Sequence, residues 1–451
     1  MRVLPEGGRS KMTWIIAGCI AAALLIAIIA CIVFLCRDPN PRRPAHIDGA
    51  NGFVQAHGTN LYDGDGNLLQ LKGVNLGNWF IQEPWMSLAS VGNFDTGHYT
   101  QRRGRTAMRQ NPNLDEDQIA RLEQIYLDHY IREEDVRTIA ALGMNAVRIP
   151  FSYMNLTEGG ALRPDAFAAL DRAISWCKKY GLYAVLDLHG APGSQNMDHH
   201  SGDDAHFDLY GNAENEARTE ALWRQIARHY RGERAVAGYD LLNEPRRRPH
   251  RYGGRVNFDY YDRLYRAVRE EDPDHLLFIE CFSFPVNGAR LRRYGWKNIC
   301  MEYHIYNLTP FSQKTCLRLY KALHNWMGYR TPVLIGEWNA YGRQKDWQTY
   351  FAYFDKLGWS FASWTYKTNA YFYRRDRRYR NLYVRTHGEK DKLNWGMFEL
   401  DLPPVDISKA TYQEIAAAYE ASVTENAQRS GAYAAWERYL RNCAARRKLP
   451  H

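Results

Sequence analysis

Two glutamates, Glu244 and Glu337, each stand at the end of a run of apolar, strand-type residues. The runs are Val236–Asn243 and Pro332–Gly336. A carboxylate at the end of a buried strand is costly to place there unless it has a partner or a function. Two of them on different strands predict the paired carboxyl groups of glycoside hydrolysis, one acting as acid/base and the other as nucleophile. Either segment alone is as easily a strand followed by a solvated loop residue.

Strand-like and helix-like segments alternate along the chain. This alternation predicts parallel strands, whose C-terminal ends would bring the two glutamates to the same side of the fold. Eight strands alternating with helices predict a (β/α)8 (TIM) barrel. A doubly wound open sheet is the alternative, but no GxGxxG sequence follows the first strand. In a barrel, functional side chains gather at the C-terminal ends of the strands, and Glu244 and Glu337 follow the fourth and seventh predicted strands. The predicted strands are Leu71–Leu76, Ala146–Ile149, Tyr183–Leu188, Val236–Leu242, Leu276–Glu280, Ile299–Tyr303, Val333–Gly336 and Phe361–Trp364. The predicted helices are Asp128–Leu142, Pro164–Tyr180, Ala213–Tyr230, Phe258–Glu271, Phe311–Trp326, Trp347–Leu357 and Ala410–Tyr419.

Composition divides the N-terminal part of the chain into three segments. Residues 13–36 carry no charged side chain and are rich in Ile, Ala and Leu, and they are long enough to span a bilayer as a helix. This predicts an uncleaved transmembrane signal anchor, preceded by a short tail at 1–12 and followed by a Pro/Arg linker at 37–50. Basic residues lie on both sides of the apolar segment, so the positive-inside rule does not decide its orientation.

The rest of the chain is expected to form a barrel domain at 51–423 and a basic helical tail at 424–451. The domain begins with a predicted hairpin between residues 53–55 and 68–70, because the segment DGDGN between them favours a turn. The aromatic residues of the tail fall at helical spacing: Tyr433, Trp436 and Tyr439. They predict an amphipathic helix that packs on the flank of the barrel, with a helix lying on a membrane surface as the alternative.

Composition also restricts the class of protein. The chain has 451 residues, of which 45% are hydrophobic and 24% charged, as is ordinary for a globular protein. Aromatic residues make up 14%, and they suit stacking against sugar rings as well as a large core. The five cysteines outside the apolar segment show no CxxC spacing, so no metal site is predicted. The net charge of +9 comes without a motif of a nucleic-acid-binding fold, so we expect no nucleic-acid partner.

Several longer segments are similar to a known family. In chain order they are LKGVNLGNWFIQEPW, GMNAVRIPFSY, YAVLDLHGAPGSQN, LLNEP, MEYHIYNL, VLIGEWN and SFASWTYK. Together they resemble family 5 of the glycoside hydrolases (the cellulase family), which belongs to the clan of retaining (β/α)8 glycosidases. The segments VNLGNWFIQEPW and DLHGAPGSQN are especially similar to the exo-1,3-β-glucanase-like branch of that family. The resemblance covers roughly residues 51–419, most of the chain after the apolar segment.

The resemblance implies that Glu244 is the general acid/base and Glu337 the nucleophile. Physical chemistry requires that one carboxyl keep its proton near neutral pH and that the other be ionised. Arg148, at the end of the second predicted strand, would keep the nucleophile ionised through its positive charge. Without the resemblance, a structural ion pair would be the better interpretation of Arg148. Tyr306 resembles the tyrosine whose hydroxyl contacts the nucleophile.

Six further positions resemble sugar-binding residues of the family. Asn243 would bind the sugar 2-hydroxyl, although an asparagine at a strand end also makes turns. Trp364 would lie under the reacting sugar, with core packing as the alternative. The remaining four are His189 and His304, which would line the subsite next to the scissile bond, and Glu83 and Asn196, which match further sugar-binding positions of the exo-glucanase-like branch.

Two features depart from the fungal-type pattern of this branch. The loop that follows Asn196 reads MDHHSG where the pattern has glycine and aromatic residues, which leaves the glucan linkage open. Arginines also cluster in two segments after predicted strand ends, at residues 246–255 and 374–380. Both clusters would stand at the barrel mouth. They are either a solvated surface or contacts to an anionic glycan or to lipid headgroups.

The sequence therefore predicts a membrane-anchored retaining β-glycosidase that cleaves β-1,3 or β-1,4 bonds of glucans without a metal or organic cofactor. We expect a single-pass protein of the cell membrane with an extracellular catalytic domain, because polymeric glycans lie outside most cells. A β-glycosidase for glycolipids or anionic cell-wall glycans is the first alternative, and a non-catalytic glycan-binding receptor is the second. Oligomeric state and endo or exo action stay open.

Overall fold

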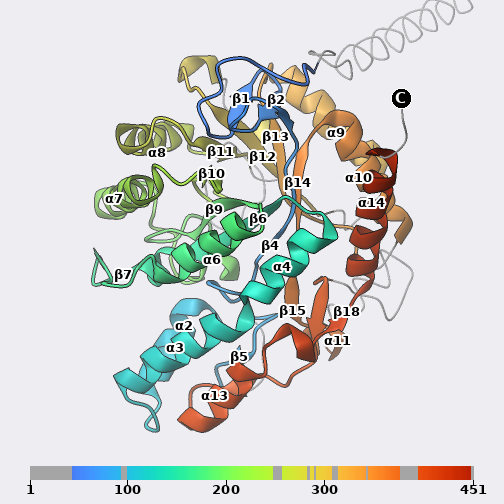
Figure 1. The fold of residues 1–451 in the computed structure, drawn as a ribbon. Coiled ribbons are helices and arrows are strands. Elements are labelled where there is room, and N and C mark those ends of the chain that lie inside the picture. The colour runs from blue at the N-terminus through green and yellow to red at the C-terminus, as the bar shows by residue number, and fades with distance from the viewer. Residues whose placement is uncertain are drawn as a thin grey trace, which may run out of the picture.

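Eight parallel strands form a closed barrel in the computed structural model of the chain (Figure 1). The structure describes residues 43–92, 99–246, 256–281, 285–288, 291–306, 313–341, 344–375 and 395–447. Each barrel strand pairs with the next one along the chain, and the last pairs with the first. The strands are β4 (Lys72–Asn75), β6 (Ala146–Ser152), β9 (Tyr183–Gly190), β10 (Val236–Asp240), β11 (Leu276–Glu280), β12 (Ile299–Tyr306), β13 (Val333–Asn339) and β14 (Ser360–Ser363). The predicted (β/α)8 barrel is confirmed, and no strand end differs from its predicted position by more than three residues.

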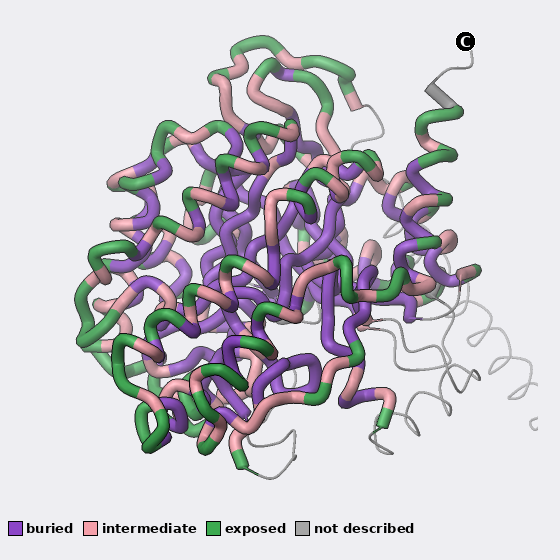
Figure 2. The backbone as a smooth tube through the Cα atoms, turned by 60° about the horizontal axis from the view of Figure 1, so that its bottom comes forward, coloured by how far each residue is buried: buried purple, intermediate pink, exposed green. Residues whose placement is uncertain are grey.

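The barrel strands are buried along nearly their whole length, and exposed residues gather on the surrounding helices (Figure 2). This explains why the strands are nearly continuous apolar runs in the sequence. A separate apolar cluster fills the N-terminal end of the barrel, where Val54 and Leu61 pack with Phe278 and Leu334. The polar and charged residues of the strands lie at the opposite, C-terminal end.

The segment that covers the N-terminal end of the barrel forms a three-stranded sheet and not the predicted two-stranded hairpin. Its strands are β1 (Gln55–His57), β2 (Asn60–Tyr62) and β3 (Leu68–Leu69), paired antiparallel in that order. The predicted turn is present between β2 and β3, where Asp63 accepts hydrogen bonds from the backbone N–H groups of Asp65 and Asn67. A second turn at Gly58, with a φ of 59°, separates β1 from β2 and was not predicted.

The helices that surround the barrel occupy most of the predicted positions. They are α4 (Glu133–Leu142), α6 (Ala168–Lys179), α7 (Ala213–Tyr230), α8 (Phe258–Glu271), α9 (Gln313–Trp326) and α10 (Gln344–Leu357). A further helix, α13 (Tyr412–Glu420), follows the last barrel strand and packs against α3 (Glu116–Tyr130). Apolar faces of the helices cover the outside of the strands and form the main core.

The predicted helix at Asp128–Leu142 is wrong as a single element. The chain leaves the helical conformation at Ile131, which ends α3 and is fully buried. The next helix, α4, begins after Arg132, whose backbone N–H donates to the carboxylate of Asp135 over 2.8 Å. This capping arrangement starts a new helix at a residue that the periodicity of the sequence placed inside one.

Several short elements extend the C-terminal end of the barrel. Between β4 and β6 the chain forms β5 (Ala89–Ser90), α2 (Gln101–Gln110) and α3. Between β6 and β9 it forms α5 (Tyr153–Leu156), β7 (Thr157–Glu158) and β8 (Ala161–Leu162). After β14 it forms β15 (Lys367–Asn369), α11 (Tyr371–Arg375), β16 (Phe398–Leu400), β17 (Val405–Asp406) and β18 (Gln428–Arg429). In Figure 1, α2, α3, β5, β15, α11 and β18 lie at the end of the barrel opposite β1 and β2.

The C-terminal helix α14 (Gly431–Arg447) packs on the barrel flank beside α10 (Figure 1). Trp436 is fully buried, and its indole N–H donates to the hydroxyl of Ser363 in β14 over 2.9 Å. The ring of Tyr439 stacks on Phe351 of α10 with 4.2 Å between the ring centroids. These aromatic residues therefore pack against the barrel, as the first of the two interpretations of the tail predicted.

The predicted membrane anchor at 13–36 lies outside the described residues, as do the tail at 1–12 and residues 37–42 of the linker. Within the part of the chain that the structure describes, none of the helices combines the length and the apolar character that crossing a bilayer demands.

Candidate active site

The two glutamates singled out in the sequence meet at the C-terminal end of the barrel. Glu337 lies in β13, and Glu244 lies four residues beyond the end of β10. A carboxylate oxygen of each lies within 4.8 Å of the other and of a ring nitrogen of His304. The side chains are 13% exposed for Glu244 and 7% for Glu337. The pair is therefore close, nearly dry and still open to solvent on one side.

Glu337 is held by two hydrogen-bond donors. The guanidinium of Arg148 donates to one carboxylate oxygen over 3.1 Å, and the hydroxyl of Tyr306 donates to the other over 2.7 Å. Burial raises the pKa of Glu337, while His304 and Arg148 oppose the rise. Because a guanidinium stays charged at any ordinary pH, the contact with Arg148 favours the ionised form of this carboxyl.

Glu244 has a different environment. Its carboxylate lies 2.8 Å from the ring of His304 and 3.4 Å from the ring of His200. Burial raises the pKa of Glu244 to about 7, against the opposing charges of Arg246 and His189. Burial also lowers the pKa of His304, to about 4. Glu244 is therefore only partly ionised near neutral pH, because burial outweighs the opposing charges.

Arg148 is the centre of a buried ionic cluster beneath the pair. Its guanidinium is fully buried and forms ion pairs with Asp187 (3.1 Å), Asp240 (2.7 Å) and Glu302 (3.3 Å), in addition to Glu337. These carboxylates come from β9, β10, β12 and β13, so one side chain from β6 ties four other barrel strands together. Such fixed contacts leave the guanidinium a single orientation, which is the one that touches Glu337.

Three predicted sugar-binding residues line the same space. Asn243 accepts a hydrogen bond from Arg148 over 2.9 Å, and its amide lies 3.4 Å from the ring of His189. His189 in turn is oriented by Asp187, 2.7 Å from its other ring nitrogen. The indole of Trp364 stacks on His189 at a centroid separation of 5.6 Å and an interplanar angle of 16°. The structure thus places Asn243, His189 and Trp364 side by side with the carboxyl pair.

The last two predicted residues reach the site through a loop. Glu83 accepts hydrogen bonds from the indole of Trp85 over 2.8 Å, and its carboxylate lies 2.9 Å from His199. The amide of Asn196 lies 2.8 Å from His200 and donates to the backbone carbonyl of Glu244 over 3.3 Å. Glu83 and Asn196 therefore flank the segment 197–202, which departs from the fungal-type pattern.

Sequence reasoning missed several residues that the structure brings to the site, among them two histidines and two glutamates. His199 and His200 drew attention only as a departure from a pattern, and they contact Glu83 and Glu244. Glu280 at the end of β11 accepts a hydrogen bond from the backbone N–H of Glu244 over 2.5 Å. Glu302, which pairs with Arg148, is fully buried. An acidic residue inside each of two otherwise apolar predicted strands was the signal for Glu280 and Glu302.

Three groups of side chains have the donor types and the spacing of a metal site. They are Glu83 with His199 and His200, Asp198 with His200 and Glu244, and Glu244 with His304 and Glu337. A cation at the third group would occupy both carboxyls of the pair. At the second group it would meet the positive charge of Arg246, which forms an ion pair with Asp198. The prediction that no metal is required rests on the two carboxyls, which can supply an acid and a nucleophile without one.

The two arginine clusters are described only in part. Arg246 is 3% exposed, so it does not belong to a solvated rim. Arg374 pairs with Glu399 over 2.8 Å, and Arg375 pairs with Asp401 over 2.6 Å. Residues 247–255 and 376–380 lie outside the described residues.

Comparison with known proteins gives the family. The model of the family "Cellulase (glycosyl hydrolase family 5)" matches residues 108–370, which is more than half of the chain, and the chain belongs to this family. A beta-xylosidase of Phanerodontia chrysosporium is 30% identical over 297 residues, covering 62% of this chain and 59% of that protein. A glucan 1,3-beta-glucosidase of Candida oleophila is 36% identical over 223 residues, covering 45% of this chain and 48% of that protein. The family match confirms the predicted family, and the glucan 1,3-beta-glucosidases agree with the predicted branch.

The same relatives set the extent of the similarity. The chain spans 59% of the beta-xylosidase and 46% of a glucan 1,3-beta-glucosidase of Pichia angusta. Among solved structures, AoRut matches with a TM-score of 0.54 at 19% identity, covering 67% of this chain and 89% of that one. An endogalactoceramidase matches with a TM-score of 0.51 at 19% identity, covering 70% and 75%. These structural matches show that the barrel fold is shared.

Proposed function

We propose that the protein is a retaining β-glycosidase that cleaves β-glucosidic bonds of glucans, β-1,3 or β-1,4, by double displacement. The observation that supports the proposal is the proximity of the carboxyl pair, in which one oxygen of Glu244 lies within 4.8 Å of one oxygen of Glu337. In retaining enzymes the two carboxyl groups lie about 5–5.5 Å apart, and in inverting enzymes about 6.5–9.5 Å, which leaves room for a water. The glucan 1,3-beta-glucosidases among the relatives support a glucan as the substrate.

In the first step Glu337 attacks the anomeric carbon while Glu244 gives its proton to the departing oxygen. The contact of Arg148 and Tyr306 with Glu337 supports the nucleophile role, because both groups donate to the ionised carboxylate. A pKa of about 7 at Glu244 supports the acid role, because this group is protonated before the step and ionised after it. In the second step the ionised Glu244 takes a proton from water, which attacks the glycosyl-enzyme ester.

The remaining site residues fit the binding of the reacting sugar. Asn243 is fixed by Arg148 with its amide group directed toward His189, where it can meet a 2-hydroxyl. The indole of Trp364 offers an apolar ring against which a pyranose can pack. Hydrogen bonds to the 2-hydroxyl strengthen as the oxocarbenium-like transition state forms.

The decisive experiment uses an activated aryl β-glucoside and follows the product by proton NMR. A retaining enzyme releases the β-anomer first, and mutarotation then produces the α-anomer. Glu337→Gln is expected to abolish turnover. Glu244→Ala is expected to accept azide in place of water and release a β-glucosyl azide, since the acid/base no longer stands between azide and the ester.

Glu270→Gln is the matched control, because Glu270 is an exposed glutamate on α8 whose partner is Arg224 of α7. It is expected to keep wild-type turnover. First release of the α-anomer would contradict double displacement, and wild-type turnover by Glu337→Gln would contradict the site itself. Binding of glucans without hydrolysis by the wild-type protein would favour a receptor.

The apolar segment 13–36 supports the further proposal that the enzyme is anchored to a membrane with its catalytic domain outside the cell. Carbonate washing of membranes from expressing cells tests the anchor, because a spanning helix stays in the pellet. Recovery of the full-length chain in the supernatant would contradict it. Protease digestion of intact cells tests the orientation.

A further inference from the structure

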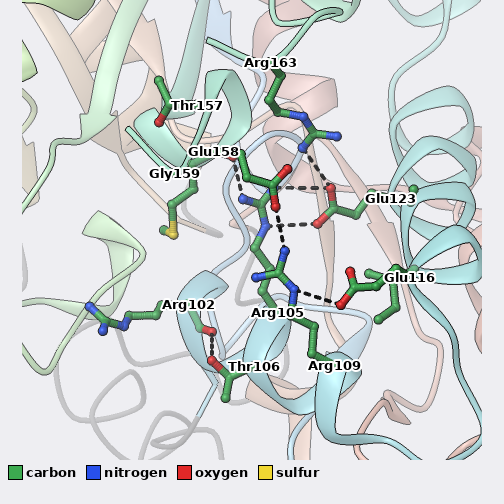
Figure 3. A pocket seen from close by; sticks show the side chains of 13 residues that line it. Arg102, Arg105, Thr106, Arg109, Glu116, Glu123, Thr157, Glu158, Gly159 and Arg163 are labelled. Carbon is green, nitrogen blue, oxygen red and sulfur yellow. Dashed lines mark hydrogen bonds and ion pairs between the residues drawn. The ribbon is translucent and has the colours of Figure 1, made fainter. Parts of the chain in front are cut away.

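A cavity lies between α2, α3 and the segment from α5 to β8 (Figure 3). Its volume is about 330 Å³, at the lower end of the range of about 300–1,000 Å³ for small-ligand pockets. The helices α2 and α3 follow β4, and α5 follows β6, so the cavity opens at the end of the barrel where the chemistry lies. Nothing in the proposed mechanism uses its side chains.

The inner wall of the cavity is an arginine–glutamate lattice. Glu123 of α3 accepts from Arg105 of α2 through both carboxylate oxygens, at 3.0 and 3.3 Å, and from Arg163 at 3.3 Å. Arg105 also donates to the backbone carbonyl of Met154. The side chains of Glu123, Arg105 and Arg163 are 20–25% exposed, so this lattice is partly buried and fixed by several contacts.

The outer wall also consists of arginine–glutamate ion pairs, but its side chains are more exposed than those of the inner wall. Arg109 pairs with Glu158 of the β7–β8 hairpin over 2.8 Å and with Glu116 of α3 over 3.5 Å, as Figure 3 shows. These side chains are between 51% and 72% exposed. Exposed pairs of this kind contribute about 0–1 kcal/mol, so a ligand can rearrange them at little cost.

The pairing determines which ligand chemistry fits. Each of the four lining arginines has a carboxylate partner. Three of these pairs are described above, and the fourth joins Arg102 to Asp203. An anion only accepts hydrogen bonds, and here it would also meet the three carboxylates of the lining. A sugar hydroxyl both donates and accepts, so it can bond to a carboxylate oxygen and to a guanidinium at once. Ile119 and Met154 add an apolar patch for the C–H face of a ring.

The cavity is joined to the loop that carries the histidines of the active site. The backbone N–H of Arg102 donates to the carbonyl of Gly202 over 3.0 Å, and its guanidinium binds Asp203 over 2.8 Å. His200, two residues before Gly202, lies 3.4 Å from Glu244. The loop that contacts Glu244 is therefore also in contact with Arg102, which lines the cavity.

We propose that this cavity is a second glycan-binding site, which holds one or two neutral sugar units of the same polymer that is cleaved at the carboxyl pair. The proposal rests on the proposed function for the identity of the polymer. The site binds through the paired arginines and glutamates and takes no part in bond cleavage. Its effect is to raise the affinity for long chains over short ones.

Calorimetry on the non-hydrolysing Glu337→Gln protein tests the site, with β-1,3- and β-1,4-linked glucose hexasaccharides as the probes. We expect two binding events for one of these probes. Adding Arg109→Ala and Glu158→Ala removes an exposed pair without changing the net charge, and is expected to weaken the second event about tenfold or more. Ala120→Gln, at an exposed position of α3, extends a side chain into the cavity and is expected to have the same effect.

Arg224→Ala with Glu270→Ala is the matched control, because it removes an ion pair of similar exposure between α7 and α8. It is expected to leave both binding events unchanged. In proteins that retain Glu337, the cavity variants are expected to raise the KM for a soluble glucan more than the KM for the aryl β-glucoside.

Other results would overturn the proposal. A single binding event in the Glu337→Gln protein, or two events that the cavity variants leave unchanged, excludes a second glycan site here. If inorganic phosphate or sulfate raises the Tm of the wild type and not that of the cavity variants, the cavity is an anion site. Failure to hydrolyse any glucoside refutes the proposed function, whereas the two binding events are measured without turnover, so the two failures are distinguishable.

Discussion

At the scale of single residues, the two glutamates differ because their partners differ in charge. Glu337 contacts Arg148, which is always protonated, and the neutral donor Tyr306. Glu244 contacts His304 and His200, and burial lowers the pKa of both histidines, so neither offers a positive charge near neutral pH. Burial raises the pKa of both carboxyls, and the direct contact with Arg148 opposes this rise at Glu337. The proposed roles of acid and nucleophile depend on this difference between the two carboxyls.

This difference predicts the alkaline side of the pH profile. As the pH rises through the pKa of Glu244, about 7, the acid loses its proton and can no longer protonate a leaving group. We expect kcat/KM for an unactivated glucoside to fall about tenfold for each pH unit above this value. A dinitrophenyl glucoside, whose leaving group needs no proton, is the control and is expected to show a much weaker fall. A flat profile to pH 9 with the unactivated substrate would rule out Glu244 as the acid.

A second prediction concerns the position of Glu244. Its φ is 42°, in the left-handed region that residues with a side chain rarely adopt. The buried carboxyl of Glu280 holds this conformation by accepting from the backbone N–H of Glu244. Burial raises the pKa of Glu280 well above its usual range, so glutamine resembles its protonated form.

Glu280→Gln is therefore expected to retain most activity, and Glu280→Leu, which offers no acceptor, to lower kcat about tenfold or more by displacing the acid. The KM for the aryl glucoside is expected to change less than kcat. The Tm of both variants reports the structural effect separately. Equal kcat values for the leucine and glutamine variants would show that the hydrogen bond does not position Glu244.

At the scale of elements, the sequence predicted the strands well because each is a buried apolar run ended by a polar residue. The sequence pattern alone therefore indicates the polar residues at these strand ends, such as Asn243 and Glu244 after β10 and Glu337 in β13. The break between α3 and α4 is not visible, because it depends on Ile131 entering the core and on Asp135 capping a new helix. The contact of His199 with Glu83 is likewise invisible, since it joins residues 116 positions apart through loop geometry.

One position in β13 connects the register of the strand with the site. A Cβ added to Gly336 would lie 1.5 Å from the carboxylate of Glu302, which is buried against Arg148. Gly336→Ala must therefore move Glu302 or the strand, and Glu337 is the next residue. We expect a loss of stability of about 1–3 kcal/mol from overpacking, measured by urea unfolding, together with a fall in kcat of about tenfold or more.

Gly232→Ala, before β10, is the control for this change, because a Cβ there meets no atom within 4 Å. It is expected to preserve both stability and kcat. Wild-type kcat in Gly336→Ala would mean that the ionic cluster around Arg148 can shift without moving Glu337.

At the scale of the whole molecule, the barrel has two different ends. The N-terminal end is closed by β1–β3 and filled with apolar side chains. The C-terminal end buries a group of carboxyls around one guanidinium, and burial raises the pKa of Glu244, Glu280 and Glu302. Stability supplied by the rest of the fold must offset the cost of burying these carboxyls.

This cost predicts how stability depends on pH. The pKa of Glu244 is about 7 in the folded protein and about 4.3 in an unfolded chain, so the folded state binds more protons between these values. Stability contributed by Glu244 is therefore fully present below about pH 4 and is lost as the pH rises through 7. A shift of this size corresponds to a loss of up to about 4 kcal/mol.

Glu244→Gln removes this titration, so its free energy of unfolding is expected to exceed that of the wild type at pH 8, with the difference shrinking toward pH 4.5. His304, whose pKa burial lowers to about 4, is uncharged in the folded protein at pH 6 and 8, so the comparison at these two pH values reports mainly on residue 244. Urea unfolding at pH 4.5, 6 and 8 measures the difference, and the exposed Glu270→Gln is expected to follow the wild type throughout. If the curves for Glu244→Gln and the wild type run parallel, Glu244 titrates normally, and the acid role loses its physical basis.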